Sequence, residues 1–256
     1  MNAHICEDGN FCSIGSGRKD MPVSSREMGV ASPRAMPRVG EAGGEMPELV
    51  DGAGNDTERV KQWRSIAAQK AGEGDRAYAI EMLSQLLAQY ESAIDYNNRG
   101  LLYYYNGELD LALADYNRAV ALAPALAATY NNRANCYAAK GELVEAIEDY
   151  DMAIDLNPFH VRALINQGIA FRHLEMYDLA IQNFDIALGL GQMEGYIYAQ
   201  RGRTYQADGD WNCAIADYHR ALEALAQPSR SPAKLIRRWQ FLVETWLEQL
   251  MSMTTA

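Results

Sequence analysis

The sequence Y-N-N-R-G-L-L-Y begins at Tyr96, and close variants of it recur every 34 residues along the chain. These variants are Y-N-N-R-A-N-C-Y from Tyr130, L-I-N-Q-G-I-A-F from Leu164 and Y-A-Q-R-G-R-T-Y from Tyr198. The spacing of their small and apolar residues is typical of an amphipathic helix. Because a fixed period of this length is the signature of a structural repeat, it decides the architecture more firmly than local propensities do.

A second motif follows the first within each period and recurs with the same spacing. It reads A-L-A-D-Y-N-R-A from Ala112, A-I-E-D-Y-D-M-A from Ala146, A-I-Q-N-F-D-I-A from Ala180 and A-I-A-D-Y-H-R-A from Ala214. The composition and period of this motif are also helical. Each unit is therefore predicted to be a pair of helices joined by a turn.

The two motifs together resemble the tetratricopeptide repeat, whose pattern combines W-x2-L-G-x2-Y, A-x3-F and a terminal proline. The matching units are 93–126, 127–160, 161–194 and 195–228, and a degenerate unit at 60–92 carries Trp63 at its fourth position. The resemblance implies an all-α fold, with a right-handed α-solenoid of five helix-turn-helix repeats over residues 58–228. Positions are numbered from 1 to 34 within each unit.

Small residues at position 8 are expected to bring the two helices of a unit together. They are Gly100, Ala134, Gly168 and Gly202, which the family geometry places against the alanines at position 20: Ala112, Ala146, Ala180 and Ala214. A larger side chain there would force the helices apart. Aromatic residues at positions 11 and 24 are expected to fill the space between neighbouring units.

Positions 7 and 23 change together from unit to unit. Arg99 occurs with Asp115, Arg133 with Asp149, Arg201 with Asp217, Gln167 with Asn183 and Ile66 with Met82. This matching of charge, amide and apolar character is what direct contact would require, since an unpaired charge between helices is penalised. We assign these residues to structure and expect contact in every unit.

The unit 161–194 departs from the pattern at both of its ends. Gly107, Gly141 and Gly209 permit the turn in the other units, and Pro124 and Pro158 stop the second helix. This unit has Glu175 at the turn and the sequence G-L-G-Q at 189–192 instead of a proline. Because glycines widen backbone freedom, residues 186–196 are predicted to be a site of bending.

A C-terminal helix is predicted over residues 231–250, with Ser231 as its N-cap and Pro232 as its first helical residue. Leu235, Trp239, Leu242, Trp246 and Leu250 follow a helical period, and Ile236, Phe241, Val243 and Leu247 widen the apolar face. The helix is expected to cap the repeats. An alternative is that it also binds a second copy or a partner.

Residues 1–57 are rich in Gly, Ser, Pro and Met and have no secondary-structure period, so they are predicted to form a disordered tail. Within it, His4, Cys6 and Cys12 match no zinc spacing, and no metal or cofactor is predicted. Cys136 and Cys213 fall at helical positions and are interpreted as small packing residues.

The amino-acid composition limits the cellular compartment in which the protein is expected and the classes of molecule that it is expected to bind. The four scattered cysteines suggest no disulfide framework, and the start of the sequence lacks a basic, apolar leader, so a reducing, cytoplasmic location is predicted. No apolar run of the length of a membrane span occurs. The formal charge of -11 disfavours broad binding to nucleic acid or anionic membranes.

The family geometry places positions 2, 5, 6, 9, 12 and 13 on a concave groove, which the sequence makes acid-free and modestly basic. None of these positions is Asp or Glu in any unit, although 34 of the 256 residues are acidic. Cations on this face include Arg64, Arg162, Arg172 and Arg203, while Asn98, Asn132, Asn166 and Gln200 recur at position 6. Asn97, Asn131 and Asn135 extend this row of amides, and Tyr104, Tyr105 and Tyr196 add apolar area.

A side-chain amide both donates and accepts, so a row of amides can pair with the peptide groups of an extended chain. We therefore predict a non-enzymatic interaction module that binds an extended, acidic or carboxylate-bearing segment of a partner protein. The carboxylate clamp of chaperone-binding relatives is not matched in any register, so binding of chaperone tails is not predicted. No Ser/His/Asp, Cys/His, phosphate-loop or metal spacing suggests catalysis.

Three alternatives to specific peptide binding stay open. Asparagine at position 6 is common in this repeat, and the amides there could simply cap or solvate the groove. The groove cations and tyrosines could instead bind RNA, although the net charge argues against it. The protein could also act as a scaffold mainly through the helix at 231–250.

Overall fold

The computed structural model describes residues 56–228 and 232–254, and every regular element in these ranges is an α-helix. The chain divides into two compact units, with the boundary after Ala125. The first contains α1 (Asp56–Glu73), α2 (Arg76–Gln89), α3 (Ala93–Asn106) and α4 (Leu109–Leu122). The second contains α5 (Ala127–Lys140), α6 (Leu143–Leu156), α7 (Val161–His173), α8 (Tyr177–Gly189), α9 (Glu194–Asp208), α10 (Trp211–Ala226) and α11 (Ala233–Thr254).

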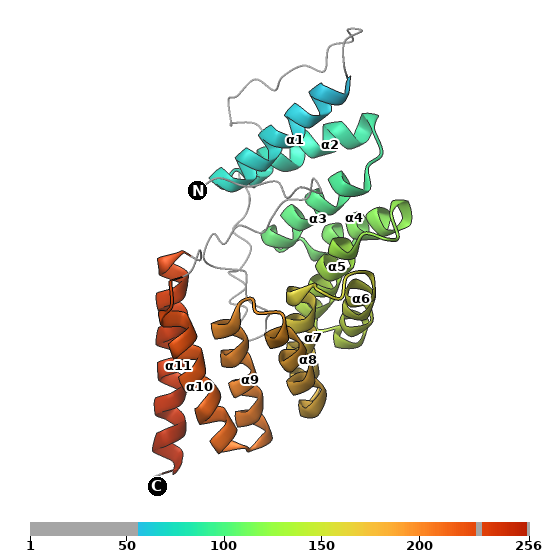
Figure 1. Cartoon of the computed structure of the whole chain (residues 1–256). Coiled ribbons are helices and arrows are strands. Elements are labelled where there is room, and N and C mark those ends of the chain that lie inside the picture. Colours follow the sequence, from blue (N-terminus) through green and yellow to red (C-terminus); the bar gives the residue numbers. More distant parts are fainter. Residues whose placement is uncertain (1–55, 229–231, 255–256) are drawn as a thin grey trace. The chain divides into compact units, whose positions relative to one another are not determined.

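Successive helices pack in the pairs that the repeat pattern predicts, as Figure 1 shows: α1 with α2, α3 with α4, α5 with α6, α7 with α8 and α9 with α10. The all-α repeat fold is thus confirmed. Helix α1 starts at Asp56, inside the segment predicted as a tail. The rest of that segment, with His4, Cys6 and Cys12, lies outside the described residues.

The core of the first unit includes apolar residues from both helices of the degenerate repeat. Trp63 and Ala67 of α1 are buried against Met82, Leu83 and Leu86 of α2, and Leu102 of α3 joins the same cluster. Ile66 packs against this cluster, which includes Met82, the residue paired with it at positions 7 and 23. The repeat that matches the pattern least is therefore stabilised mainly by burial of its apolar surface.

The turn inside each repeat needs one residue in the left-handed conformation. Gly107, Gly141 and Gly209 supply it with φ values of 84°, 84° and 91°. At Gly107 the turn closes with a bond from the Glu108 N–H to the Tyr103 carbonyl at 2.9 Å, which satisfies a carbonyl at the helix end. Glu175 takes the same role with φ 59°, a conformation that costs a residue with a Cβ atom more than it costs glycine.

Position 8 requires a small residue because the two helices of each repeat approach each other closely at this point. A Cβ atom added at Gly202 would lie 2.8 Å from the Tyr218 ring and 3.3 Å from the Ala214 carbonyl oxygen. The same contact recurs at Gly100 with Tyr116. The aromatic rings at position 24 are fully buried and fill space inside their own repeat. The sequence pattern had predicted only that these rings pack between neighbouring repeats. Rings at position 11 are half-buried.

The connection between α8 and α9 differs from the others in its backbone. Gly191 and Met193 both have positive φ, at 65° and 57°. By contrast, α6 ends at Leu156, two residues before Pro158, as predicted. Leu188 and Leu190 pack near Ile197, so apolar contact continues through the connection. Bending at this junction stays a prediction.

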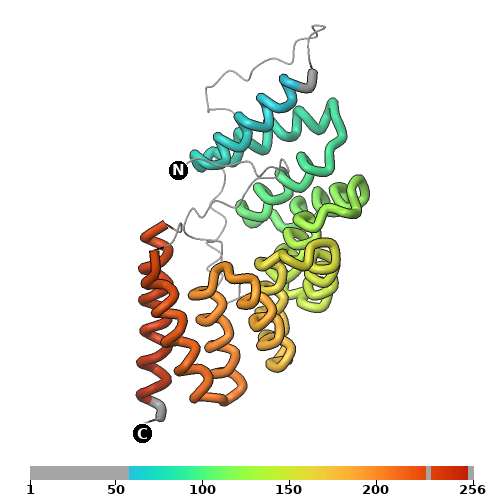
Figure 2. Tube along the Cα trace, in the orientation of Figure 1, coloured from blue at the N-terminus to red at the C-terminus, as the bar shows by residue number. Residues whose placement is uncertain are grey.

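Helix α11 packs along α10 and closes the C-terminal end of the second unit. Trp239, Val243 and Leu250 are buried with Tyr218 and Ala221 of α10. The helix begins at Ala233 and continues to Thr254, four residues beyond its predicted end; Ser231, its predicted N-cap, lies outside the described residues. Phe241 is 67% exposed, so the buried face is narrower than the apolar pattern suggested. Figure 2 shows the Cα trace of this helix alongside that of α10.

Among the helices that the structure describes, none combines the length and apolarity that a membrane span requires.

Candidate functional site

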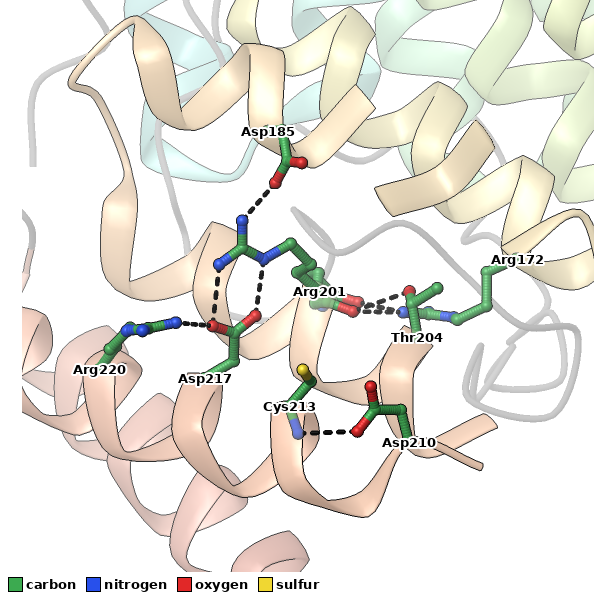
Figure 3. A network of polar contacts seen from close by, with 9 residues as sticks. Arg172, Asp185, Arg201, Thr204, Asp210, Cys213, Asp217 and Arg220 are labelled. Atoms are coloured by element: carbon green, nitrogen blue, oxygen red, sulfur yellow. Dashed lines mark hydrogen bonds and ion pairs between the residues drawn. The ribbon is translucent and has the colours of Figure 1, made fainter. Parts of the chain in front are cut away.

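The predicted contacts between positions 7 and 23 are present in the repeats and are structural. The Arg201 Nε donates to Asp217 Oδ2 at 2.6 Å and its Nη2 donates to Oδ1 at 2.9 Å (Figure 3). Arg99 and Asp115 form the same two-point pair, as do Arg133 and Asp149. In the amide repeat, Asn183 Nδ2 donates to Gln167 Oε1 at 2.7 Å.

Position 7 also reaches back to position 25 of the preceding repeat. Arg201 pairs with Asp185 in this way, and Gln167 Nε2 donates to Asp151 Oδ1 at 2.6 Å. The Arg201 guanidinium lies 5.4 Å from the Tyr198 ring centroid and 5.9 Å from that of Tyr205. These contacts commit the arginines at position 7 to holding repeats together, so they are excluded from the candidate site.

In the first unit, most of the predicted groove residues make contacts with other protein residues. Asn97 and Asn98 are each 1% exposed, and Asn97 Nδ2 donates to Asn98 Oδ1 at 3.4 Å. Tyr104 and Tyr105 lie edge to face with ring centroids 5.7 Å apart. Arg64 forms a two-point ion pair with Asp95, which is 1% exposed.

Asp95 is the residue that the groove analysis missed, because it stands at position 3 and not at a groove position. A partial signal was available, because position 5 of one repeat and position 3 of the next match in character in some repeats, although Asn131 is followed by Ala163. Arg64 precedes Asp95, and Ile165 precedes Ile197, which share an apolar core. The charge of Arg64 is therefore compensated, and the first unit is less basic on this face than predicted.

In the second unit, the predicted amides of α5 and α7 are brought together. Asn166 Nδ2 of α7 donates to Asn135 Oδ1 of α5 at 2.9 Å, and the Tyr150 hydroxyl donates to the same oxygen at 2.7 Å. Asn131 Nδ2 donates to Asn132 Oδ1 at 3.3 Å along α5. Asn135 and Asn166 are both half-buried.

The amide row continues onto α9 through an arginine. Arg172 Nη1 of α7 donates to Gln200 Oε1 at 2.9 Å and to the Gln200 carbonyl at 3.2 Å. Gln200 is 3% exposed, and its carbonyl also accepts from Thr204. Arg203, one turn further along α9, lies with its guanidinium carbon 4.8 Å from the Trp246 ring centroid. Trp246 belongs to α11 and was not predicted to reach this face.

Tyr196 lies at the centre of this basic region. Its ring packs edge to face on Trp239 with centroids 4.7 Å apart, and its hydroxyl is buried close to the side chain of Gln200. Burial raises the pKa of Tyr196 well above its ordinary value, while the charges of Arg172, Arg203 and Arg162 act in the opposite direction. Arg162 itself is exposed near the start of α7.

Side chains that could bind a metal ion or act as nucleophiles do not form clusters within the described ranges. No three His, Cys, Asp or Glu side chains there form a group that could hold a metal ion. Cys136 is buried. A hydrogen bond with Asp210 is the largest cause that raises the pKa of Cys213, which opposes formation of a thiolate.

The sequence profile of the tetratricopeptide repeat matches residues 93–126 and 127–160. The chain therefore contains tetratricopeptide repeats. Repeats of this family form protein–protein interaction modules and are typically not enzymes. No curated protein matches the sequence.

Solved structures of other tetratricopeptide repeat proteins have a similar fold. A crystal structure of MamA is 23% identical with a TM-score of 0.57, over 62% of this chain and 93% of that one. The MamA RS-1 ArsTM double mutant is 16% identical with a TM-score of 0.59, over 65% and 94%. A thermophilic tetratricopeptide repeat protein in Thermus thermophilus is 18% identical with a TM-score of 0.57, over 75% and 98%.

Proposed function

We propose that the face formed by α5, α7 and α9 binds an extended, carboxylate-bearing segment of a partner protein. The family supports protein–protein interaction in general, and the residues on this face support the finer proposal. An extended segment leaves its peptide groups available for hydrogen bonds, and it needs donors and acceptors at regular spacing.

The observation that carries the proposal is the hydrogen bond between Asn135 and Asn166. It orients both amides, because it uses the oxygen of Asn135 and one N–H of Asn166. The Asn135 amide nitrogen and the Asn166 amide oxygen make no hydrogen bond to the described residues, so this linked pair retains one donor and one acceptor. This pair matches the C=O and N–H of a peptide chain.

Charge favours an acidic segment over a basic one. The groove positions of α5, α7 and α9 carry Arg162, Arg172 and Arg203 and no Asp or Glu. Elsewhere the protein is strongly acidic, with a formal charge of -11. A local basic face on an acidic protein attracts acidic segments to that face and repels them from the rest of the surface.

A random octapeptide library displayed on phage tests the proposal with the full chain. We expect enrichment of peptides containing Asp or Glu, and about tenfold weaker binding of the best peptide by Asn166→Ala, because one or more hydrogen bonds are lost. Asn212→Ala, an exposed amide on α10, is the matched control and should bind like the parent. Absence of any enriched peptide, or full binding by Asn166→Ala, contradicts the proposal.

A second candidate is a scaffold that acts through α11, because Phe241 and Met251 are 67% and 52% exposed on that helix. Large apolar side chains that remain exposed mark surfaces which another molecule can cover. If this helix carries the function, Phe241→Ser releases the partner from the protein while binding of the library peptides is retained.

A further inference from the structure

We propose that the outer face of α11 pairs with the same face of a second copy of this chain, with the two helices antiparallel about a two-fold axis at Phe241. The inference is independent of peptide binding by α5, α7 and α9. It names a second copy as the molecule that covers the exposed side of α11. A two-fold contact requires that a residue and its partner exchange roles between the two copies.

The outer face of α11 lies opposite the side of the helix that packs on α10. On the packed side, Trp239, Val243 and Leu250 are buried (Figure 1). The outer face consists of six exposed residues that helical spacing places within about a third of the circumference. They are Lys234, Arg237, Arg238, Phe241, Glu244 and Glu248. Phe241 is 67% exposed at the middle of this face.

The charges of the outer face are sorted by sign along the helix. Its cations all precede Phe241, and its carboxylates all follow it. Lys234 and Arg238 stand four residues apart, as do Glu244 and Glu248, and like charges at this spacing destabilise a helix. Cations near the start of a helix and carboxylates toward its end also oppose the helix dipole. The isolated helix therefore gains nothing from this order of charges.

No charged residue of the outer face is compensated inside the protein. Among the described residues, none forms an ion pair with Lys234, Arg238 or Glu244, and the same is true of Arg237 and Glu248. The Arg237 Nε donates only to the Ala233 carbonyl of its own helix, at 3.5 Å. A surface charge pattern that is unfavourable within its helix and unpaired indicates complementarity to another molecule.

The pattern is complementary to itself when the helix direction is reversed. Arg238 and Glu244 stand three residues before and after Phe241, and Lys234 and Glu248 stand seven residues before and after it. An antiparallel copy therefore places Arg238 opposite Glu244 of the second copy, and Lys234 opposite Glu248. Each of these ion pairs occurs twice because of the symmetry. The two Phe241 rings meet at the axis, where an aromatic pair adds to the attraction.

Other occupants satisfy only half of this face. A nucleic acid or an anionic membrane is attracted by the cations but repelled by Glu244, by Glu248 and by the formal charge of -11. A parallel copy places like charges opposite each other. Since one face of one helix makes a small contact, we expect a weak dimer with a Kd of about 10 μM.

Sedimentation equilibrium of the full chain tests the pairing. The parent should form a reversible dimer. Arg238→Glu and Glu244→Arg should each weaken it at least about tenfold, since each puts like charges together at two places. The two variants mixed in equal amounts should associate as tightly as the parent, because opposite charges then meet at both places. Glu223→Arg, which reverses an exposed carboxylate of α10, is the control and should dimerise like the parent.

Two further measurements separate the outcomes. Phe241→Ser should also weaken the dimer about tenfold, and circular dichroism should show that every variant keeps the parent's helix content and Tm. A parent that stays monomeric at about 100 μM overturns the proposal. So does a mixture that associates no better than the single variants, or a dimer that survives both charge reversals. Library peptides are assayed on the same variants, so a failed dimer with peptide binding retained leaves the proposed function intact.

Discussion

Arg64 of α1 and Asp95 of α3 form a two-point ion pair across two successive repeats. The Arg64 Nη2 lies 2.7 Å from Asp95 Oδ2, and its Nε lies 2.8 Å from Oδ1. The Arg64 side chain is 27% exposed and that of Asp95 only 2%. The pair therefore links the degenerate repeat to the next one and neutralises a cation that the sequence placed in the groove.

Removal of one partner should weaken the first unit. Asp95→Asn leaves Arg64 without its carboxylate in a partly buried site, and we expect a loss of about 2 kcal/mol in the free energy of unfolding. Urea unfolding followed by circular dichroism measures it. The double variant Arg64→Gln/Asp95→Asn should recover part of the loss; strict additivity of the two single changes contradicts a direct coupling.

Close packing at position 8 predicts opposite results for two glycines. Gly202→Ala places a Cβ atom 2.8 Å from the Tyr218 ring and should cost about 1–3 kcal/mol. Gly189→Ala meets no atom within 4 Å at the end of α8 and should be neutral or stabilising by up to about 1 kcal/mol. Thermal unfolding compares them, and equal effects of the two substitutions refute the steric explanation.

The turn at Glu175 predicts a stabilising substitution. Because φ is 59° there, Glu175→Gly should relieve left-handed strain and raise stability by about 1 kcal/mol, as glycine does in the other turns. Glu175→Ala keeps the Cβ atom and is the control, which should give no gain. A Tm for the glycine variant below that of the alanine variant disproves the account.

Covariation of positions 7 and 23 predicts that an ion pair can be replaced by a pair of amides. Arg201→Gln and Asp217→Asn should each destabilise by about 2–3 kcal/mol, since each leaves a charge poorly paired. The double variant reproduces the Gln167–Asn183 arrangement and should be closer to the parent than either single variant. A double variant that is as unstable as the sum of the single ones refutes the exchange.

His160 predicts a specific pH dependence. Its Nδ1 accepts from the Ala163 N–H at 3.2 Å and caps α7, and burial lowers the pKa of His160 below its ordinary value near 6.5. The unfolded chain then binds the proton more readily, so stability is complete above about pH 6.5 and decreases as the pH falls through the lowered pKa. Protonation also removes the cap acceptor, which is worth about 1 kcal/mol.

The substitution His160→Asn isolates this effect, because asparagine caps a helix without titrating in this range. The difference in unfolding free energy between parent and variant should change between pH 7 and pH 5, with the parent losing more. Parallel pH profiles for the two proteins exclude a role for His160.

Much of the fold follows from the sequence because each repeat is built from short-range contacts. The period of 34, the small residue at position 8 and the turn glycines specify one helix pair, and copies of the pair stack by the same contacts. Even the partners Arg201 and Asp217 could be predicted, since three repeats carry the same charges and the others change both members together.

The site depends on contacts that occur once, and a repeated pattern contains no signal for them. Arg64 meets Asp95, Arg172 meets Gln200, and Trp246 of the capping helix lies under Arg203. Long side chains have several rotamers, and the choice among them depends on which neighbour the adjacent element presents. The sequence by itself thus determined the helices, their pairing and the residue types of the groove. Tertiary structure alone decided which of those amides and cations are already satisfied, because satisfaction is a property of neighbours in space.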